Sequence, residues 1–454
     1  MWIGVDDTDS ITGGCTTYVV RTIIQKITKK YEIIGYPRLV RLNPNIPWKT
    51  RGNGALCLHV GKHGGKIKRK IGEINSQDVF CSLTFTKELD ENEQRNLATI
   101  VKETVETQAR IDDENTNPGY VLLLKKPDVE LYQNAVTKIV TLDNVQIILH
   151  NQQAMFEGYK NGRGLIGATA AISWEPLDRT FELIAYRPQQ RWGTKRQIDL
   201  KSVIQMDADC PSTFDNYDAR NHHNRIVPNS PCPILYGIRG NDVEELVIAS
   251  TQVKSEPVDS WLLFETNQGT DNHLQKKQIA QIQPFESVIT EGSVVENPFT
   301  IQGGHVLFTI KDLTGTIPCA AYEPTKEFRN TVRGLHVGDL VEVYGGVREH
   351  PLTINLEKLT VKHLITLLVK TENPVCQTCG KHMKSKGTEQ GYKCIKCGTT
   401  SVTPIIQEKP RTITKGFYEV PVCARRHLSK PLKRMNQATP SLLVSFSGNE
   451  GIQR

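Results

Sequence analysis

The chain has 454 residues, which is too long for one compact core and favours three or four domains. Its 38% hydrophobic and 23% charged residues are typical of a globular protein, and no apolar run approaches the roughly 18 to 20 residues that span a bilayer. The first residues are acidic where a secretory signal has a basic and then an apolar region, so we expect a cytoplasmic protein without membrane contact.

The net charge of +7 is unevenly distributed. Residues 372–454 contain 14 Lys or Arg against 5 Asp or Glu, a net +9, which leaves −2 for the 371 residues before them. A near-neutral body with a basic C-terminal segment predicts a module that binds a polyphosphate, most simply nucleic acid. A solvated basic surface is the alternative.

An acidic segment follows the first predicted strand. Residues 2–5 form a short apolar run, Asp6, Asp7 and Asp9 follow it, and a predicted amphipathic helix begins near Thr16. Carboxylates are ligands for Mg²⁺, and the free amides at a helix N-terminus attract a phosphate. The pattern predicts a magnesium and phosphate site with the hydroxyl of either Thr16 or Thr17 beside it, although an acidic turn followed by a helix cap would look the same. The chain has no Walker lysine motif, which excludes a P-loop enzyme.

A basic loop rich in proline and glycine comes next, at residues 37–55. Such a loop entering a strand can bind a triphosphate opposite carboxylates. Alternatively, its cations are solvent-exposed surface residues that bind no ligand. The candidate phosphate-binding side chains are Lys49, Arg51 and Asn53, with Arg38 and Arg41 nearby.

Glycines gather again at residues 162–168. Gly162, Arg163 and Gly164 are candidates for close approach to a phosphate or nucleotide, and packing of a helix against a sheet explains the glycines equally well.

An acidic and aromatic stretch follows at residues 207–218. Carboxylates beside aromatic rings suit a small organic cation with an apolar stem, and an ordinary acidic loop is the alternative. The candidate carboxylates are Asp207, Asp209, Asp215 and Asp218.

Residues 284–364 alternate in the manner of an all-β unit. Five strands are expected at 287–301, 305–311, 316–322, 340–347 and 353–361, with a helix at 325–335. Five strands with a helix after the third is the order of an OB-fold, which holds extended nucleic acid across its sheet. A β-barrel used only for domain packing is the alternative.

Four of the eleven cysteines are spaced Cys376-x2-Cys379-x14-Cys394-x2-Cys397. Two such pairs predict a four-thiolate zinc ribbon, whose metal supplies the folding energy that so small a segment lacks. A redox-active pair is the alternative.

The C-terminal segment combines aromatic residues at 417–418 with a dense run of cations. This combination suits contact with RNA, and a solvated tail is the alternative. The candidate RNA-binding side chains are Arg425, Arg426, Lys430, Lys433 and Arg434.

Taken in order, these motifs resemble the archaeal tRNA 2-agmatinylcytidine synthetase family. The resemblance extends from the first strand to about residue 434 and depends on long motifs in the same order. They are residues 4–10, 15–17, 41–45, 49–54, 112–119, 162–168, 213–216, 231–240 and 425–432.

The resemblance implies an ATP-dependent ligase that acts on isoleucine tRNA with a CAU anticodon. In the family, ATP phosphorylates the C2 oxygen of the wobble cytidine and agmatine displaces it, which yields agmatidine and allows the tRNA to read AUA. AMP and two phosphates are released. The enzyme also phosphorylates one of its own threonines, which corresponds to Thr16 here.

The resemblance also implies a multidomain α+β fold. We expect a kinase-like α/β domain at 1–133, a ferredoxin-like domain at 134–275, an OB-fold at 284–364, a zinc ribbon at 372–402 and a basic tail at 403–454. The implied cofactors are ATP, Mg²⁺ and Zn²⁺, with Mg²⁺ on the three aspartates, agmatine on the carboxylates of 207–218, and no obligate protein partner.

Two other classes remain open from the residues alone. One is a non-catalytic RNA-binding protein built on the OB-fold and zinc ribbon, which would leave Asp6, Asp7 and Thr16 without a chemical role. The other is a phosphotransferase acting on a different RNA acceptor. ATP turnover separates the first class from an enzyme, and dependence on agmatine and the CAU tRNA separates the second.

Overall fold

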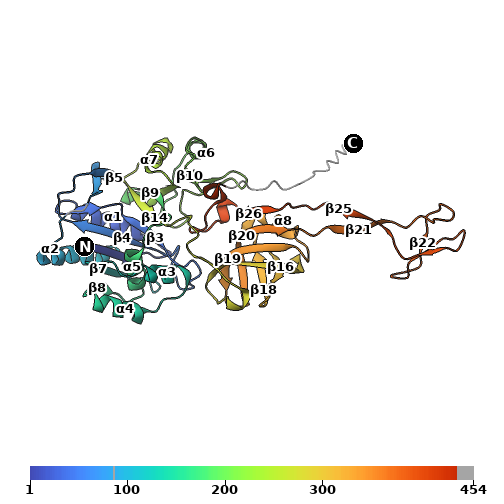
Figure 1. Ribbon diagram of the computed structural model, residues 1–454. Coiled ribbons are helices and arrows are strands. Elements are labelled where there is room, and N and C mark those ends of the chain that lie inside the picture. Colours follow the sequence, from blue (N-terminus) through green and yellow to red (C-terminus); the bar gives the residue numbers. More distant parts are fainter. Residues whose placement is uncertain (85–86, 437–454) are drawn as a thin grey trace.

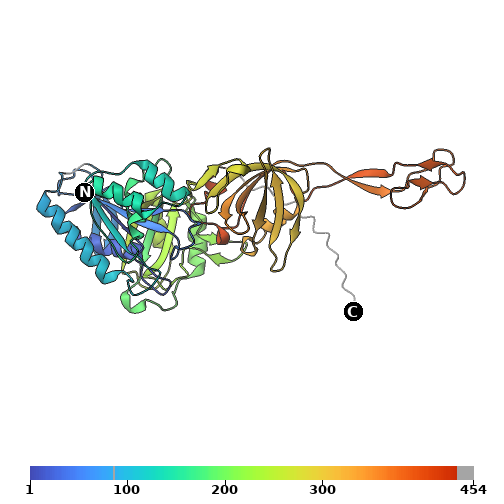
Figure 2. The ribbon, with the colours of Figure 1, turned by 90° about the horizontal axis from the view of Figure 1, so that it is seen from below.

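The computed structural model describes residues 1–84 and 87–436, and it shows an elongated molecule in three parts (Figures 1 and 2). A large α+β body contains the N-terminus, a β-barrel follows it, and a long two-stranded arm carries a small β-ribbon at the far end. Among the helices of the described residues, none is both long and apolar enough to cross a membrane.

One twelve-stranded mixed sheet forms the body. Its strands run in the order β10-β13-β9-β14-β5-β6-β2-β4-β1-β7-β8, and β3 pairs with both β14 and β4. The first part of the chain supplies β1 (Trp2–Asp6), β2 (Glu32–Ile34), β3 (Arg38–Arg41), β4 (Gly54–Gly61), β5 (Lys68–Ile74), β6 (Gln77–Ser82), β7 (Gly119–Leu123) and β8 (Met155–Gly158). The second part supplies β9 (Thr180–Tyr186), β10 (Thr213–Phe214), β13 (Ile234–Gly240) and β14 (Ser260–Thr266), besides a separate hairpin of β11 (Tyr217–Asp218) and β12 (His223–Asn224).

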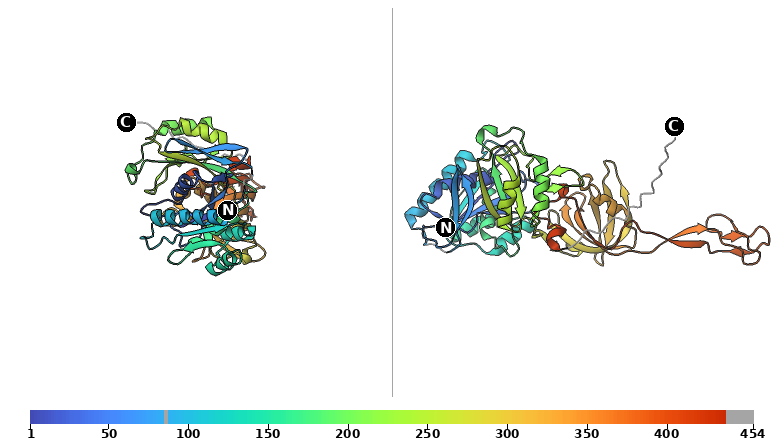
Figure 3. Two further views of the ribbon diagram at one scale, coloured as in Figure 1. Left: turned by 90° about the vertical axis from the view of Figure 1, so that its left-hand side faces the viewer. Right: turned by 90° about the horizontal axis from the view of Figure 1, so that it is seen from above.

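Helices cover both faces of this curved sheet (Figure 3, left). The apolar faces of α1 (Thr16–Ile27) and α2 (Glu91–Gln108) share one core with strands from both halves of the sheet, so the sheet curves around them. The outer face of the first half is covered by α3 (Val129–Thr137), α4 (Leu142–Asn151) and α5 (Gly164–Ser173). The second half is covered by α6 (Leu200–Asp209) and α7 (Val243–Gln252), and a 3-10 turn spans Gln189–Arg191.

Strand β1 lies at the centre of the first half, between β4 and β7, and pairs antiparallel with both. Its side chains alternate between the two cores: Ile3 and Val5 face α1, while Gly4 lies against the backbone of α5. Burial on both faces explains why the run before Asp6 contains no polar residue. The acidic segment is therefore held at the end of a strand whose middle residues are buried on both faces.

The barrel has the OB-fold order expected from the sequence. Its strands are β16 (Ser287–Thr300), β17 (Val306–Lys311), β18 (Thr316–Ala321), β19 (Leu340–Arg348) and β20 (Thr353–His363), and pairing of β16 with β19 closes it. The helix between the third and fourth strands is α8 (Phe328–Arg333), preceded by a 3-10 turn at Glu323–Thr325. The short strand β15 (Leu274–Lys276) and a 3-10 turn at Ile279–Gln281 lead into it.

The arm consists of β21 (Leu367–Glu372) paired antiparallel with β25 (Ile405–Lys409), and the ribbon at its end contains β22 (Lys384–Ser385), β23 (Tyr392–Lys393) and β24 (Thr400–Ser401) (Figure 3, right). The arm thus joins the ribbon to the barrel by two strands.

The segment expected to be a basic tail is folded up to residue 436. After β25, strand β26 (Gly416–Glu419) adds to the barrel beside β20, and Ile413, Tyr418 and Val420 enter the barrel core. Two 3-10 turns, Val422–Ala424 and Leu432–Met435, follow as the chain packs against the body. The sequence did not predict this return of the chain to the barrel, because burial of a few apolar residues, not the cations around them, decides it. Residues 437–454 of the expected tail lie outside the described residues.

Candidate active site

A cavity of about 500 Å³ opens where the two halves of the body and the C-terminal segment meet. Its lining includes the acidic segment after β1, the basic loop before β4, residues of β9 and β13, and His427. The sequence-predicted residues that line it are Asp6, Asp7, Asp9, Thr16, Lys49, Arg51, Asn53 and Arg163. Residues from separate predicted motifs thus share one site.

Asp7 sits in a strained backbone conformation at the start of the acidic segment. Its φ of 53° lies in the left-handed region, which costs free energy for a residue with a Cβ and is common at functional sites. Two hydrogen bonds hold its carboxylate, one from Thr50 Oγ1 at 3.0 Å and one from the Asn117 amide at 3.1 Å. The carboxylate is therefore fixed toward the cavity from two loops.

The carboxylates of the acidic segment crowd one another. Burial raises the pKa of Asp6 well above its usual value, and the charges of Asp7 and Asp9 raise it further. Burial also raises the pKa of Asp7, against the hydrogen bonds from Thr50 and Asn117. A divalent cation near these oxygen ligands would relieve the repulsion, although among the described residues only the four cysteines of the ribbon bring three or more ligand atoms within 4.8 Å of one another.

Gly167 explains part of the glycine-rich segment. A Cβ on this residue of α5 would lie 1.8 Å from Asp6 Oδ2, so any side chain would displace the carboxylate. Gly164 has a packing role instead, because its Cβ would lie 2.3 Å from the backbone nitrogen of Gly119. Gly162 has a φ of +72° in the turn before α5. Gly162 and Gly164 do not line the cavity. Arg163, which lies between them in the sequence, does.

Thr16 is the first residue of α1 and is buried. Its Oγ1 lies 3.1 Å from Thr8 Oγ1, which donates to it, so the Thr16 hydroxyl hydrogen is available to another acceptor. The N-terminal turn of this 12-residue helix carries free backbone amides and a partial positive charge beside the same cavity.

Cations border the acidic segment. Arg51 forms an ion pair with Asp9 and also donates to Ser230 Oγ at 2.7 Å and to the Gly14 carbonyl at 2.9 Å. Burial alone would lower the pKa of Arg51, but the charge of Asp9 raises it, so this guanidinium stays protonated. Burial lowers the pKa of Lys49.

Two further predicted residues support this wall. The Arg163 guanidinium lies 5.4 Å from the ring centre of Trp48, which holds it over the cavity. Asn53 has a φ of 41° and donates to the Asn43 carbonyl at 2.8 Å, so it shapes the basic loop.

A second group of cations in the cavity escaped the sequence analysis as a group. Arg41, Arg225, Arg239 and His427 all line it, together with the carboxylate of Glu182. They are far apart in the sequence and only the fold brings them together. The one signal in the sequence was that several of these residues fall within the motifs that carry the family resemblance.

The four aspartates of 207–218 lie elsewhere. None of the four is among the residues that line the cavity. Asp207 accepts from Asn216 Nδ2 at 2.9 Å, Asp209 is exposed, Asp215 pairs with Arg425, and Asp218 accepts from the Cys423 amide at 2.9 Å. Two of the four therefore hold the C-terminal segment.

The five predicted RNA-binding cations also contact protein groups. Arg425 is buried between Asp215 and Glu419, Arg426 donates to Asn45 Oδ1 at 2.6 Å, and the last three reach residues of the body. Their partners are Asp178 for Lys430, the Thr213 carbonyl for Lys433, and Asp178 with the Gly269 carbonyl for Arg434. In the structure these side chains attach the segment to the body.

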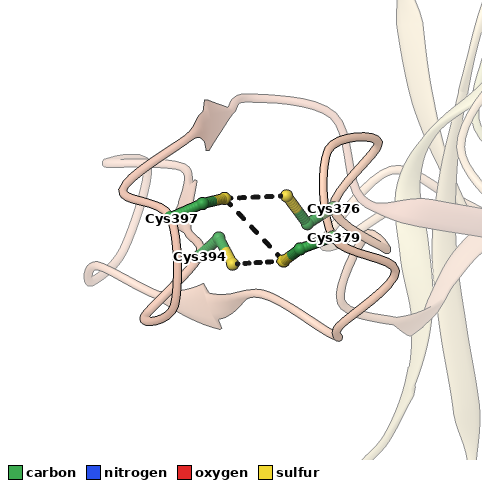
Figure 4. A group of neighbouring side chains, drawn as sticks. All are labelled: Cys376, Cys379, Cys394 and Cys397. Atoms are coloured by element: carbon green, nitrogen blue, oxygen red, sulfur yellow. Dashed lines mark hydrogen bonds between the residues drawn. The ribbon is translucent and has the colours of Figure 1, made fainter.

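The four ribbon cysteines converge at the end of the arm (Figure 4). The ligand atoms of Cys376, Cys379, Cys394 and Cys397 all lie within 4.8 Å of one another. The Sγ–Sγ distances of 3.3 and 3.8 Å are too long for a disulfide and close to the about 3.8 Å that a tetrahedral ion with ~2.3 Å bonds requires. The donor set thus fits Zn²⁺.

Family models cover most of the chain. Residues 2–161 match the TiaS TCKD domain, 162–273 the TiaS FLD domain, 288–362 an OB-fold nucleic acid binding domain and 373–413 the TiaS C-terminal zinc ribbon domain. The limits expected from the sequence for the first two domains stay a prediction.

Whole-length relatives agree with the models. The tRNA 2-agmatinylcytidine synthetase TiaS of Archaeoglobus fulgidus is 41% identical over 442 residues, covering 96% of this chain and 98% of its own. A crystal structure of TiaS in complex with its isoleucine tRNA and ATP superposes with a TM-score of 0.84 at 40% identity, over 97% of this chain and 99% of that one. The complex of TiaS with the same tRNA, AMPCPP and agmatine gives 0.82 at 38% identity, over 97% and 98%. This chain belongs to the tRNA 2-agmatinylcytidine synthetase (TiaS) family.

Proposed function

We propose that this protein joins agmatine to C2 of the wobble cytidine of the CAU-anticodon isoleucine tRNA, with cleavage of ATP to AMP and two phosphates. The cavity carries this proposal, because it places a carboxylate triad, a helix N-terminus with a buried threonine, and several cations around one space. Full-length similarity to proteins named for this reaction supports the substrates. A protein that modifies tRNA in this way would work in the cytoplasm.

The chemistry requires that a poor leaving group be activated. The C2 carbonyl oxygen of cytidine is amide-like, so it must become a phosphate ester before an amine can displace it. Phosphoryl transfer depends on positioning and on charge stabilisation around the transferred group.

We assign the acidic segment to Mg²⁺, with Asp6, Asp7 and Asp9 as its ligands. When bound, Mg²⁺ would neutralise charge on the ATP phosphates. Thr50 and the Asn117 amide would keep Asp7 oriented for this role, and Gly167 leaves room for the Asp6 carboxylate. The chain's own contribution is a rigid arrangement that exists before the nucleotide binds.

Around the phosphates, we assign charge stabilisation to Lys49, Arg51 and Arg163, with Asn53 shaping the loop that carries the first two. The amides at the start of α1 add a partial positive charge. Thr16 would be the residue that receives a phosphoryl group, because its hydroxyl is at the cavity and its hydrogen is not used by Thr8.

The barrel and the ribbon would hold the tRNA while the cytidine enters the cavity. A base stacked in an anticodon loop must leave the stack to be modified, and grip elsewhere on the tRNA offsets that cost. Zn²⁺ on the four ribbon cysteines would fix the fold of the ribbon, and the arm gives it a long reach from the cavity.

Incorporation of labelled agmatine tests the proposal. The purified protein, ATP, Mg²⁺ and the unmodified CAU isoleucine tRNA should transfer the label to the tRNA, and omission of ATP should abolish transfer. Lysine in place of agmatine, and a tRNA with another wobble base, serve as controls. A protein that binds this tRNA and ATP but transfers no label would contradict the proposal.

A further inference from the structure

Three guanidinium groups meet on one wall of the cavity, and we call Arg41, Arg225 and Arg239 the arginine cluster. Arg41 ends β3, Arg225 follows the small hairpin, Arg239 lies in β13, and His427 of the C-terminal segment lies beside them. Four separate parts of the chain thus bring their basic side chains to the same place.

Negative charge does not balance the cluster. Within residues 1–84 and 87–436, the one carboxylate that forms an ion pair with any of the three is Glu182, with its Oε1 3.4 Å from Arg239 Nε. In the same part of the chain, the guanidinium groups of Arg41 and Arg225 donate only to backbone carbonyls, those of Gly52 at 3.5 Å and Arg425 at 3.4 Å. An enclosed cation without a counter-charge is costly, so the cluster is incomplete as it stands.

Hydrogen-bond donors in the cluster are also unused. The buried Nε atoms of Arg41, Arg225 and Arg239 have no hydrogen-bond partner among the described residues, and neither has His427 Nδ1. Arg239 is itself more than nine-tenths buried, with a relative exposure of 9%. Unpartnered donors around a cavity are arranged for an acceptor that enters from outside.

Titration agrees with an excess of positive charge. Burial lowers the pKa of Arg41 to about 10; the charge of Glu182 opposes this shift and the charge of Arg239 adds to it. Burial lowers the pKa of His427 well below its usual value, and the three guanidinium groups lower it further. His427 is therefore neutral, which leaves the arginines as the charged groups and the imidazole as a hydrogen-bonding one.

We propose that the arginine cluster binds one backbone phosphate of the tRNA next to the wobble cytidine, at a subsite separate from that of the ATP phosphates. This inference rests on the proposed function. A nucleotide that leaves the anticodon stack brings its own phosphate toward the cavity, and guanidinium groups bind phosphate with paired, directional hydrogen bonds.

The position of the cluster favours the tRNA over ATP as the source of the phosphate. His427 belongs to the segment between barrel and body, where neighbouring Arg426 contacts Asn45, and Asn45 Nδ2 donates to the barrel residues Glu286 at 2.8 Å and Ser287 at 2.9 Å. The cluster thus adjoins the part of the molecule assigned to tRNA. The aspartates and Arg51 already supply the groups that a nucleotide needs.

The test pairs one protein change with one change in the RNA. Arg225→Gln removes a cluster cation that has no ion pair in the described chain, and Arg220→Gln removes an exposed cation five residues away as the matched control. The full-length CAU isoleucine tRNA is assembled with a single neutral methylphosphonate, placed in turn at each phosphate around the wobble cytidine. Binding is measured with full-length protein over a range of salt concentrations.

One methylphosphonate position should weaken binding to the wild type and to Arg220→Gln by about tenfold, and should have no effect on Arg225→Gln. The salt dependence of log K for Arg225→Gln should fall by about one contact, a slope change of ~0.7 to 0.9, while ATP affinity stays within about twofold. Arg225→Lys should keep the wild-type salt slope but lose affinity, which a purely structural role would not produce.

Two results would overturn the inference. Equal sensitivity of the wild type and Arg225→Gln at every position means that no phosphate of the tRNA contacts the cluster. A tenfold loss of ATP affinity with the methylphosphonate effect intact would place the cluster in the nucleotide site. Agmatidine formation by the wild-type preparation shows in either case that the proposed function stands, and its absence would contradict that function instead.

Discussion

Asp6 ends strand β1 with its carboxylate against the backbone of Gly167 and close to two other aspartates. An apolar strand on one side and like charges on the other disfavour the ionised form of this carboxyl group, so without a cation it retains a proton to higher pH. Such a residue is expected to lower the stability of the free protein in return for function.

Replacing this carboxylate tests whether it lowers the stability of the free protein. Because burial and neighbouring charges raise the Asp6 pKa, the folded protein holds a proton that the unfolded chain releases, and stability falls as pH rises from the unfolded pKa toward the folded one. Asp6→Asn removes this loss, so we expect its melting temperature at pH 8 to exceed that of the wild type by about 2 to 4 °C if the effect is worth ~1 kcal/mol. The difference should shrink at pH 5, as thermal denaturation at both pH values would show.

Added Mg²⁺ provides the control for this comparison of the wild type with Asp6→Asn. Added Mg²⁺ should raise the melting temperature of the wild type and leave that of Asp6→Asn unchanged, and the variant should not form agmatidine. An equal rise in both proteins would place the ion elsewhere.

Gly167 gives a second prediction at this scale. In Gly167→Ala the new Cβ would lie 1.8 Å from Asp6 Oδ2, so the carboxylate must move and agmatidine formation should fall at least about tenfold, mainly in kcat. Gly13→Ala is the matched control, because its Cβ meets nothing closer than 3.8 Å, and it should remain active. Steady-state kinetics that affect the two variants equally would contradict this role of Gly167.

At the scale of elements, the C-terminal segment is attached by ion pairs. Arg425 is buried between Asp215 and Glu419, whose Oε1 lies 2.6 Å from it. Arg425→Gln leaves both carboxylates without their cation, which should cost about 3 to 5 kcal/mol and expose the segment to limited proteolysis. Arg220→Gln, which breaks an exposed pair with Glu327, should change stability by less than about 1 kcal/mol.

The same variant separates attachment from RNA contact. If Arg425 instead binds RNA, as the sequence analysis predicts, Arg425→Gln will weaken tRNA binding while its melting temperature and proteolysis pattern match those of the wild type.

Local signals predicted the elements that local sequence determines. The apolar run before Asp6, the OB-fold strand order and the cysteine spacing each lie within a short stretch, and all three are confirmed. The arginine cluster could not be predicted, because its members are brought together by pairing of strands from distant parts of the chain. The return of β26 to the barrel was missed for a similar reason, since four residues carry little periodicity.

At the scale of the whole molecule, the ribbon is separated from the cavity by the arm (Figure 1). Cys379→Ser should lose the bound zinc and weaken tRNA binding at least about tenfold, while ATP binding stays unchanged because the cavity belongs to the body. Zinc content, tRNA affinity and ATP affinity measured on one preparation would check this. Cys423 is not one of the four ribbon cysteines, so Cys423→Ser should leave zinc content, tRNA affinity and ATP affinity unchanged. Loss of ATP binding in Cys379→Ser would contradict the separation of the ribbon from the cavity.

The central claim is that this one cavity converts the C2 oxygen of the wobble cytidine into a phosphate leaving group. The most direct test places ¹⁸O at that C2 carbonyl in the CAU isoleucine tRNA and follows it by mass spectrometry after reaction with ATP, Mg²⁺ and agmatine. We predict ¹⁸O in inorganic phosphate, in an amount equal to the agmatidine formed, and none with Asp7→Ala. Appearance of ¹⁸O in AMP, or its retention in the modified tRNA, would contradict the account.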